Sequence, residues 1–339
     1  MFRSARMGIQ NRAYAGSGVN MTEILLLIFL VLSSLFIVFA KKTYRVIIYY
    51  AVFSLITSII YLFLGAPDVA MAEAGISAFA TIFFIVCVEK YYKRGEGLQV
   101  EVAVAERPRK LFTKIILPMI FVAGLCGLFI CFVPTGYPHT GLRDQYLIMF
   151  MRDVGGENAV TAIYLGYRVY DTLFEALLLV IAVVAVLHLS WYSGDMVQDG
   201  RPSEIENSRM AKFTMRIICP IILLFGMYLV LNGHISAGGG FLGGLAFASF
   251  FICRFFVLGI ADLSIKKAIK MEEIIFINII LLPILAIFTG LPYMFWGVSE
   301  FFQNAYLTAM SALIGMKVAF GFFVLLYRYI AIERLHDES

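Results

Sequence analysis

Two ionisable side chains of this sequence stand inside long apolar runs. Lys317 lies near the middle of one run, and Glu73 lies one to two helical turns inside another. A desolvated lysine loses its proton readily and a buried carboxylate can hold a cation or a proton, so both residue types suit an ion pathway. The alternatives are that Lys317 is the permanent partner of a buried carboxylate and that Glu73 reaches the membrane interface. We expect both residues to belong to an ion pathway or to the charges that control it.

Three further charged residues, Arg168, Asp171 and Glu175, precede or open an apolar run with the spacing i, i+3 and i+7. If this piece is helical, the spacing places them on one face, where they would form a network of ion pairs. Such a network either anchors a helix end at the interface or holds and relays a cation, and geometry must decide. Asp68 is a fourth candidate, although its place after Pro67 at a helix start also explains it structurally, through the helix dipole.

The stretch GHISAGGGFLGG, residues 233–244, is unusually rich in glycine. Small residues four apart let two membrane helices approach closely, so this stretch predicts a helix-packing surface made by Gly239, Gly240, Gly243 and Gly244. His234 adds a protonatable group at the outer end of a helix, and His188 lies near the cytoplasmic end of another. Each histidine is a weaker pathway candidate, with a structural explanation beside it.

Motifs for bound cofactors are absent from the sequence. There is no Cys-x-x-Cys pair, no glycine-rich phosphate loop and no His-Glu-x-x-His, and all five cysteines stand in apolar runs. We therefore predict no cofactor, no metal site and no redox or hydrolytic site in this chain. The chemistry that it carries is expected to be ionic.

The composition indicates the setting of these residues. The chain has 339 residues, of which 61% are hydrophobic and 15% charged, too little polar surface for a soluble globule. Lipid requires every backbone polar group to be paired, so continuous apolar runs predict helices rather than a barrel. We predict an all-α polytopic membrane protein with about nine transmembrane helices, at 23–40, 45–64, 69–88, 113–133, 173–191, 216–233, 239–259, 273–291 and 305–328.

Basic residues predict the orientation, because they gather in cytoplasmic loops. Twenty of the 27 fall on one predicted face, six fall on the other and Lys317 lies within a span. The N-terminus is therefore expected outside and the C-terminus in the cytoplasm. Three arginines before Met21 fit this poorly, and Met21 is a candidate for the physiological start.

The sequence resembles a known family in three places. The glycine-rich stretch and the residues around Lys317 resemble the MnhB family, the B component of Mrp-type multisubunit cation/proton antiporters. The matching residues are Gly233-His234, Gly238-Gly239-Gly240-Phe241, Gly243-Gly244 and Ile314-Gly315-Met316-Lys317-Val318. Two earlier blocks are similar to the C-terminal part of MrpA, the large Mrp component, namely Gly65 to Ala70 with Glu73, and Tyr167-Arg168 with Asp171-Thr172 and Glu175. In membrane-bound hydrogenases these parts are the separate proteins MbhD, MbhE and MbhF, and residues 21–335 resemble all three fused.

The resemblance implies a domain organisation, and the polar stretches at 89–112 and 191–215 provide the joints. The expected parts are an N-terminal tail at 1–20, an MbhD-like three-helix part at 21–110, an MbhE-like two-helix part at 111–195, a cytoplasmic linker at 196–215 and an MnhB-like four-helix domain at 216–339. Four positions depart from the family pattern: Ala237 replaces Pro, Leu242 replaces Gln, Gly166 replaces the acid of the antiporter version, and Phe174 replaces Gly. Phe174 is closer to the hydrogenase version.

The resemblance also implies a function. We expect a multi-pass plasma-membrane subunit of a sodium/proton antiporter-like, ion-translocating module in a membrane-bound hydrogenase or a related ferredoxin-driven respiratory complex. The alternatives are a subunit of a plain Mrp antiporter and an assembly scaffold that carries no ions. Expected partners are large antiporter-like subunits, small Mrp-type subunits, nickel-iron hydrogenase subunits and the bilayer, with no nucleic acid. Neutral variants Glu73→Gln and Lys317→Met are expected to leave folding intact, because each removes a membrane-embedded charge without creating a cavity.

Overall fold

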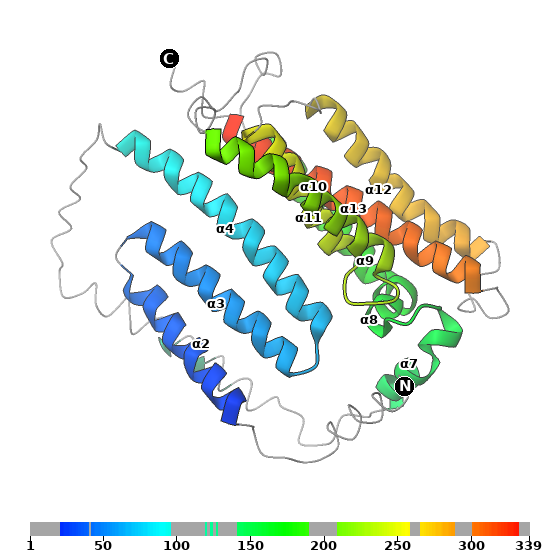
Figure 1. The fold of residues 1–339 in the computed structure, drawn as a ribbon. Coiled ribbons are helices and arrows are strands. Elements are labelled where there is room, and N and C mark those ends of the chain that lie inside the picture. Colours follow the sequence, from blue (N-terminus) through cyan, green and yellow to red (C-terminus); the bar gives the residue numbers. More distant parts are fainter. Residues whose placement is uncertain are drawn as a thin grey trace. The chain divides into compact units, whose positions relative to one another are not determined.

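The computed structural model describes residues 21–40, 42–95, 119–120, 123–124, 127, 141–189, 209–257, 265–288 and 300–331. Within these ranges the chain forms helices joined by turns and no strand, which confirms the all-α class (Figure 1). Eight of the nine predicted spans coincide with helices. The ninth, 113–133, lies almost wholly outside the described residues, as do the tail at 1–20 and most of the linker.

Five of the described helices are long and apolar enough to cross a membrane. These spans are Thr43–Phe63, Pro67–Ile85, Val169–His188, Phe213–Asn232 and Glu300–Tyr327. Two shorter apolar helices are Ile24–Phe39 and Gly240–Arg254. The chain is therefore a membrane protein, whereas the count of nine spans and the orientation of the termini stay predictions.

The chain divides into a unit of residues 1–88 and 150–339 and a smaller unit of residues 89–149. The described residues of the smaller unit include most of the 13-residue helix α7 (Gly141–Asp153). The residues discussed below belong to the larger unit.

The larger unit begins with three apolar helices. The first two, α2 (Met21–Phe39) and α3 (Thr43–Phe63), pack against each other as a hairpin. The turn after α3 places Gly65 at a φ of 75°, a left-handed conformation that glycine adopts without strain, and α4 (Pro67–Gly95) follows with Pro67 at its first position. Both α2 and α3 are apolar on most of their surface, as expected of helices that face lipid.

A broken helical segment follows α7. Asn158 caps the short helix α8 (Ala159–Ala162) by accepting a hydrogen bond from the Val160 backbone N–H at 2.9 Å. A π-helical turn, η2 (Ile163–Tyr167), comes next, and Arg168 is not helical (φ −123°, ψ 37°). The long helix α9 (Val169–Leu189) starts after this break. Of the three charged residues Arg168, Asp171 and Glu175, only Asp171 and Glu175 lie on a regular helix, because Arg168 belongs to the break before α9.

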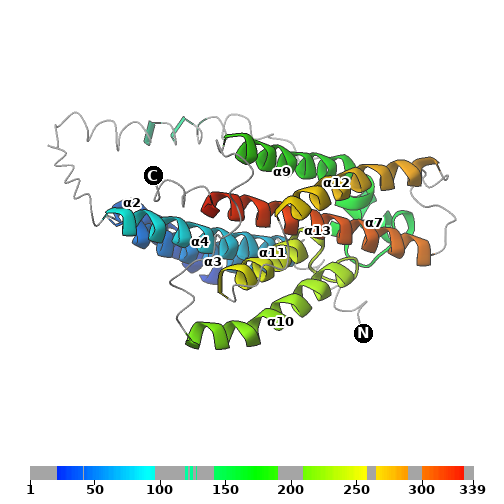
Figure 2. The same cartoon turned by 90° about the horizontal axis from the view of Figure 1, so that it is seen from above.

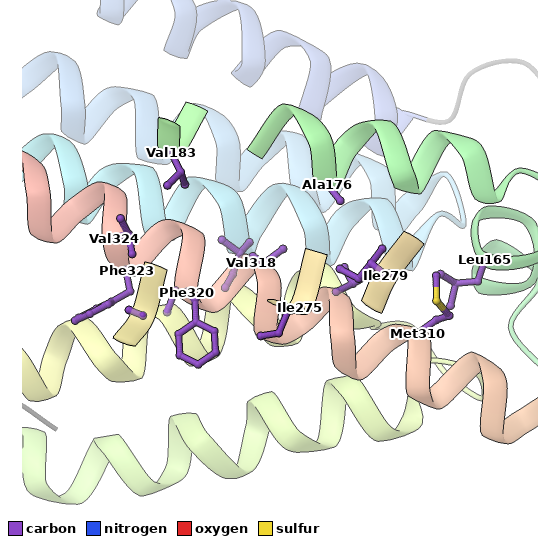
Figure 3. Close-up of a cluster of buried hydrophobic side chains, with 14 of the residues drawn as sticks. Leu165, Ala176, Val183, Ile275, Ile279, Met310, Val318, Phe320, Phe323 and Val324 are labelled. Atoms are coloured by element: carbon purple, nitrogen blue, oxygen red, sulfur yellow. The ribbon is translucent and has the colours of Figure 1, made fainter. Parts of the chain in front are cut away.

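The C-terminal half is a group of four helices: α10 (Arg209–Asn232), α11 (Gly240–Val257), α12 (Ile265–Phe288) and α13 (Glu300–Ala331). Helix α13 is central, since it packs against α9, α10, α11 and α12 (Figures 1 and 2). Its apolar window is 67% buried, against 22% or less for the other four spans. The core includes Ile275 and Ile279 of α12 beside Val318, Phe320 and Phe323 of α13 (Figure 3).

Several helices begin earlier than the apolar pattern predicts. Helix α10 starts at Arg209, inside the predicted linker, and α12 starts at Ile265 rather than at residue 273. Their first turns carry lysines and arginines, which tolerate a helix end because their long side chains extend toward water. Hydrophobicity therefore locates the membrane core of a helix and misses its polar first turns. For α12 this difference matters, because it places Glu272 within the helix.

Candidate functional site

Lys317 on α13 forms a buried ion pair with Glu272 on α12. The lysine Nζ donates a hydrogen bond to Glu272 Oε1, and the two residues are 1% and 3% exposed. The ring of Phe276, one turn along α12, has its centroid 5.0 Å from the ammonium nitrogen and provides a cation–π contact. This is the arrangement named as the alternative for Lys317, a permanent carboxylate partner. A buried pair of this kind can also share a proton, since the neutral pair avoids the desolvation of two charges.

Glu272 is the site residue that the sequence reasoning missed. It stands on the buried stripe of α12, between Ala268 and Ile275, whereas the next residue, Glu273, is exposed. The signal was present in the sequence, because Ala268, Glu272, Ile275 and Ile279 follow the helical spacing of a core face. It was missed because two adjacent glutamates beside three lysines read as the polar flank of a span.

Glu73 lies on α4 and faces α3. The hydroxyl of Ser54, which is fully buried, donates a hydrogen bond to the Glu73 carboxylate. One turn away, Ser58 donates to the Ala70 backbone carbonyl at 2.7 Å. A Cβ added at Gly75 would lie 3.3 Å from the Leu242 side chain of α11, so the small residue lets α4 and α11 approach closely. Glu73 is thus a half-buried carboxylate between helices, and no described contact joins it to Lys317.

Asp68 belongs to a polar junction centred on Asn158. The two N–H groups of the Asn158 side-chain amide donate to Asp68 Oδ1 and to the Ser236 carbonyl, each at 2.9 Å, and the amide nitrogen lies 3.2 Å from the Gly233 carbonyl. Asp68 Oδ1 also accepts from the Gly238 backbone N–H at 3.3 Å. Asn158 is buried. One amide therefore connects the start of α4, the start of α8 and the loop between α10 and α11, and its role was not predicted.

His234 contributes mainly through its backbone. Its carbonyl accepts hydrogen bonds from the backbone N–H groups of Glu157 and Asn158, at 2.8 and 3.0 Å. Its ring Nδ1 lies 3.4 Å from Thr308 Oγ1, a long contact. His188 lies exposed in the last turn of α9. No described contact joins either histidine ring to the Lys317–Glu272 pair.

The glycines of the predicted packing surface lie against neighbouring helices. A Cβ at Gly240 would collide with the Ser311 carbonyl, and one at Gly244 would lie 2.6 Å from the Gly315 carbonyl, so α11 and α13 meet backbone to backbone. Gly243 faces α10 instead, where a Cβ would lie 2.9 Å from the Gly226 carbonyl. Each of these three glycines is required by a close approach.

Gly239 has a different role in the loop before α11. Its φ is 116°, and a Cβ there would collide with the hydroxyl of Tyr164 from the π turn. Burial raises the pKa of Tyr164, so this phenol stays protonated at neutral pH. The Gly239 backbone N–H donates to the Leu229 carbonyl at 3.0 Å, which closes the turn between α10 and α11.

Arg168 and Asp171 form an exposed ion pair at the start of α9. Their side chains are 61% and 48% exposed, the geometry of an interfacial anchor. Glu175 is also exposed and lies one turn further along α9. Gly166, where the antiporter version of the family has an acid, packs against Val154, and an added Cβ would lie 2.6 Å from a Val154 methyl group.

The structure therefore joins Lys317 with Glu272, Asp68 with the His234 loop and Arg168 with Asp171, in three separate places. The described residues contain no group of three or more His, Cys, Asp or Glu side chains that could hold a metal ion. What the arrangement provides is one buried ion pair and one half-buried carboxylate.

Two family models match the chain. A domain related to the MnhB subunit of Na+/H+ antiporters matches residues 210–333, and the MbhD component of MBH matches residues 28–93. The chain is 31% identical over 99 residues to the antiporter subunit mnhB2 of Staphylococcus saprophyticus, covering 29% of this chain and 67% of that protein. It is 25% identical over 191 residues to the antiporter subunit mnhA2 of Staphylococcus aureus, covering 53% of this chain. The chain spans only 21% of that larger relative.

Two solved structures share the fold. One is the Mrp complex from Dietzia sp. DQ12-45-1b, with a TM-score of 0.64 at 16% identity, covering 91% of this chain and 35% of the matched chain. The other is the membrane-bound sulfane sulfur reductase, an archaeal respiratory membrane complex, with a TM-score of 0.55 at 25% identity, covering 66% of this chain and 99% of the matched chain. The resemblance read from the sequence is confirmed: the chain belongs to the family of membrane subunits shared by Mrp-type (Mnh) cation/proton antiporters and membrane-bound hydrogenases.

Proposed function

We propose that this chain is a multi-pass plasma-membrane subunit of a sodium/proton antiporter-like module, and that the module works within a membrane-bound hydrogenase or a related ferredoxin-driven respiratory complex. The observation that carries the proposal is the Lys317–Glu272 pair, which lies in the MnhB-related part and has no described structural need for charge. An apolar pair of similar volume would pack there at least as stably. We infer that the charged pair serves a function other than packing, and moving protons or controlling ions is the function that it suits.

Two of the matches lead us to prefer a redox-driven complex to a plain Mrp antiporter. The match to MbhD covers the first helices, and the matched chain of the sulfane sulfur reductase is covered almost completely. We infer that the N-terminus lies outside and that the cytoplasmic face carries the redox partner, with nickel-iron hydrogenase proteins as the expected class.

Co-purification tests this proposal. Gentle detergent extraction of native membranes, followed by mass spectrometry of the intact complex, should recover large antiporter-like subunits and redox proteins together with this chain. Recovery of this chain alone, in an active form, would contradict the proposed membership of a complex. Recovery with Mrp subunits only would replace the respiratory complex by a plain antiporter.

Glu73→Gln is expected to abolish most ion transport without affecting assembly. Glutamine keeps the shape and can still accept a hydrogen bond from Ser54, while the charge that could hold a cation is lost. We expect at least a tenfold loss of sodium-gradient formation in vesicles containing the variant complex. Glu157→Gln, at an exposed glutamate before α8, is the matched control and should transport normally. Normal transport by Glu73→Gln would remove this residue from the pathway.

A further inference from the structure

The outer face of α9 combines apolar and charged residues in an unusual way. Helix α9 packs against α13 and α12 (Figure 2). Its buried residues include Thr172, Ala176 and Val183. On the opposite side Phe174 and Leu178 are 64% and 66% exposed. Exposed apolar side chains such as these are explained by contact with lipid. The feature that lipid does not explain is Glu175, which is exposed beside them.

Glu175 lies at membrane depth. The span runs from Val169 to His188, so Glu175 is its seventh residue, roughly 9 Å from the start at 1.5 Å per residue. Arg168 is engaged by Asp171, one turn before Glu175. Among the described residues none donates a hydrogen bond to the Glu175 carboxylate or pairs with it. A charged carboxylate left in this state in hydrocarbon is strongly disfavoured, so a basic partner from outside the described residues would stabilise it.

The remaining predicted span of the chain does not provide that partner. Segment 113–133 is apolar and contains one basic residue, Lys114, at its start. By the predicted orientation Lys114 lies near the cytoplasm, whereas Glu175 lies in the half of α9 that is nearer the external side of the membrane. The sequence of this span therefore has no side chain to match the carboxylate.

We propose that the outer face of α9 is the docking surface for a transmembrane helix of another subunit, and that this helix presents a lysine or arginine at the depth of Glu175. Charge complementarity identifies the partner, because a basic side chain is what a lipid-exposed carboxylate lacks. Phe174 and Leu178 supply the apolar contact around the ion pair. The proposal rests on the proposed function only in that the chain is part of a complex.

The outer face of α10 is the natural comparison. Ile217, Ile221 and Leu224 are exposed there to a similar extent, and no acidic residue stands among them. That apolar face can contact lipid without a helix of another subunit. It therefore provides a control position on the same molecule.

The test is site-specific photo-cross-linking in the intact, natively purified complex. A photoreactive phenylalanine analogue is placed at Phe174, or at Ile221 as the control, and adducts are identified by mass spectrometry. We expect Phe174 to attach to one helix of another subunit, with a lysine or arginine within one turn of the attachment point. The yield should exceed that of any protein adduct at Ile221 at least tenfold.

Charge variants test the ion pair itself. Glu175→Gln should reduce the Phe174 adduct severalfold and Glu175→Lys at least tenfold, and an acidic replacement of the partner's basic residue should restore the adduct with Glu175→Lys. Adducts with lipid only, with residues 113–133, or with a helix lacking a basic residue would overturn the proposal. Unchanged adducts combined with lost transport in Glu175→Gln would overturn it too, by placing the carboxylate in the ion pathway. Co-purification of the other subunits distinguishes the proposed function from the proposed docking surface. If the other subunits co-purify normally but Phe174 forms adducts only with lipid, the docking surface is refuted and membership of a complex is not.

Discussion

Lys317→Met is expected to destabilise the protein by about 3–5 kcal/mol, because it leaves Glu272 buried without its partner. Glu272→Gln should also destabilise the protein, because the amide oxygen can still accept a hydrogen bond from Lys317 but carries no charge to balance the buried ammonium. Both single variants should reduce the amount of assembled complex recovered from membranes. The measurement is the thermal midpoint of the purified complex together with its yield.

The double variant Lys317→Met with Glu272→Leu separates structure from transport. Two apolar side chains fill the buried site between α12 and α13, so stability and assembly should return to near the wild-type level. Ion-gradient formation should remain lost if the pair moves or controls ions. Normal transport by a well-assembled double variant would reduce the pair to a structural role and favour the scaffold alternative. Glu273→Gln, at the exposed neighbour on α12, is the matched control and should change neither quantity.

Gly244→Ala is expected to disrupt the close contact between α11 and α13. The new Cβ would lie 2.6 Å from both the Gly315 carbonyl oxygen and the Val318 Cβ, so α11 and α13 must separate. Overpacking of this kind typically destabilises by about 1–3 kcal/mol. Because α13 is the central helix, the separation should also displace Lys317, two residues beyond Gly315. We expect a lower thermal midpoint and a loss of assembled complex.

Gly141→Ala is the matched control for this variant. Gly141 opens α7, is exposed, and a Cβ added there has no neighbour within 4 Å. The stability change should stay within about 0.5 kcal/mol. Equal stability of the Gly244→Ala and Gly141→Ala complexes would show that the backbone contact between α11 and α13 is looser than described.

Sequence reasoning predicts the features of this fold that depend on one segment at a time. Eight predicted spans coincide with helices because the length of an apolar run is set by the membrane, whatever its neighbours. The glycines at 240 and 244 were expected to meet another helix, because small residues four apart have few other uses in a span. The partner surface, formed by Ser311 and Gly315, required the structure.

Features that depend on two distant segments were not predictable. Glu272 is 45 residues from Lys317, and only packing shows that they share one buried site. Knowing the partner also reverses an expectation. Lys317→Met was expected to leave folding intact, because it removes a lone charge. With Glu272 as the partner, the same variant is expected to leave an unpaired buried carboxylate. Asn158 shows the same limit, because nothing in its surroundings indicates contact with residues 90 positions earlier and 78 later.

The Asn158 junction also bears on why these segments occur in one polypeptide. In Staphylococcus saprophyticus the counterpart of the C-terminal half is a protein of its own, whereas here Asn158 bonds both to Asp68 of the first half and to Ser236 of the second. Covalent connection turns such an encounter from bimolecular to unimolecular, at an effective concentration in the millimolar range for short flexible linkers. It also fixes the copy number of the halves at one to one. In the folded chain the two halves are also joined by the Asn158 hydrogen bonds and by the packing of α9 against α13.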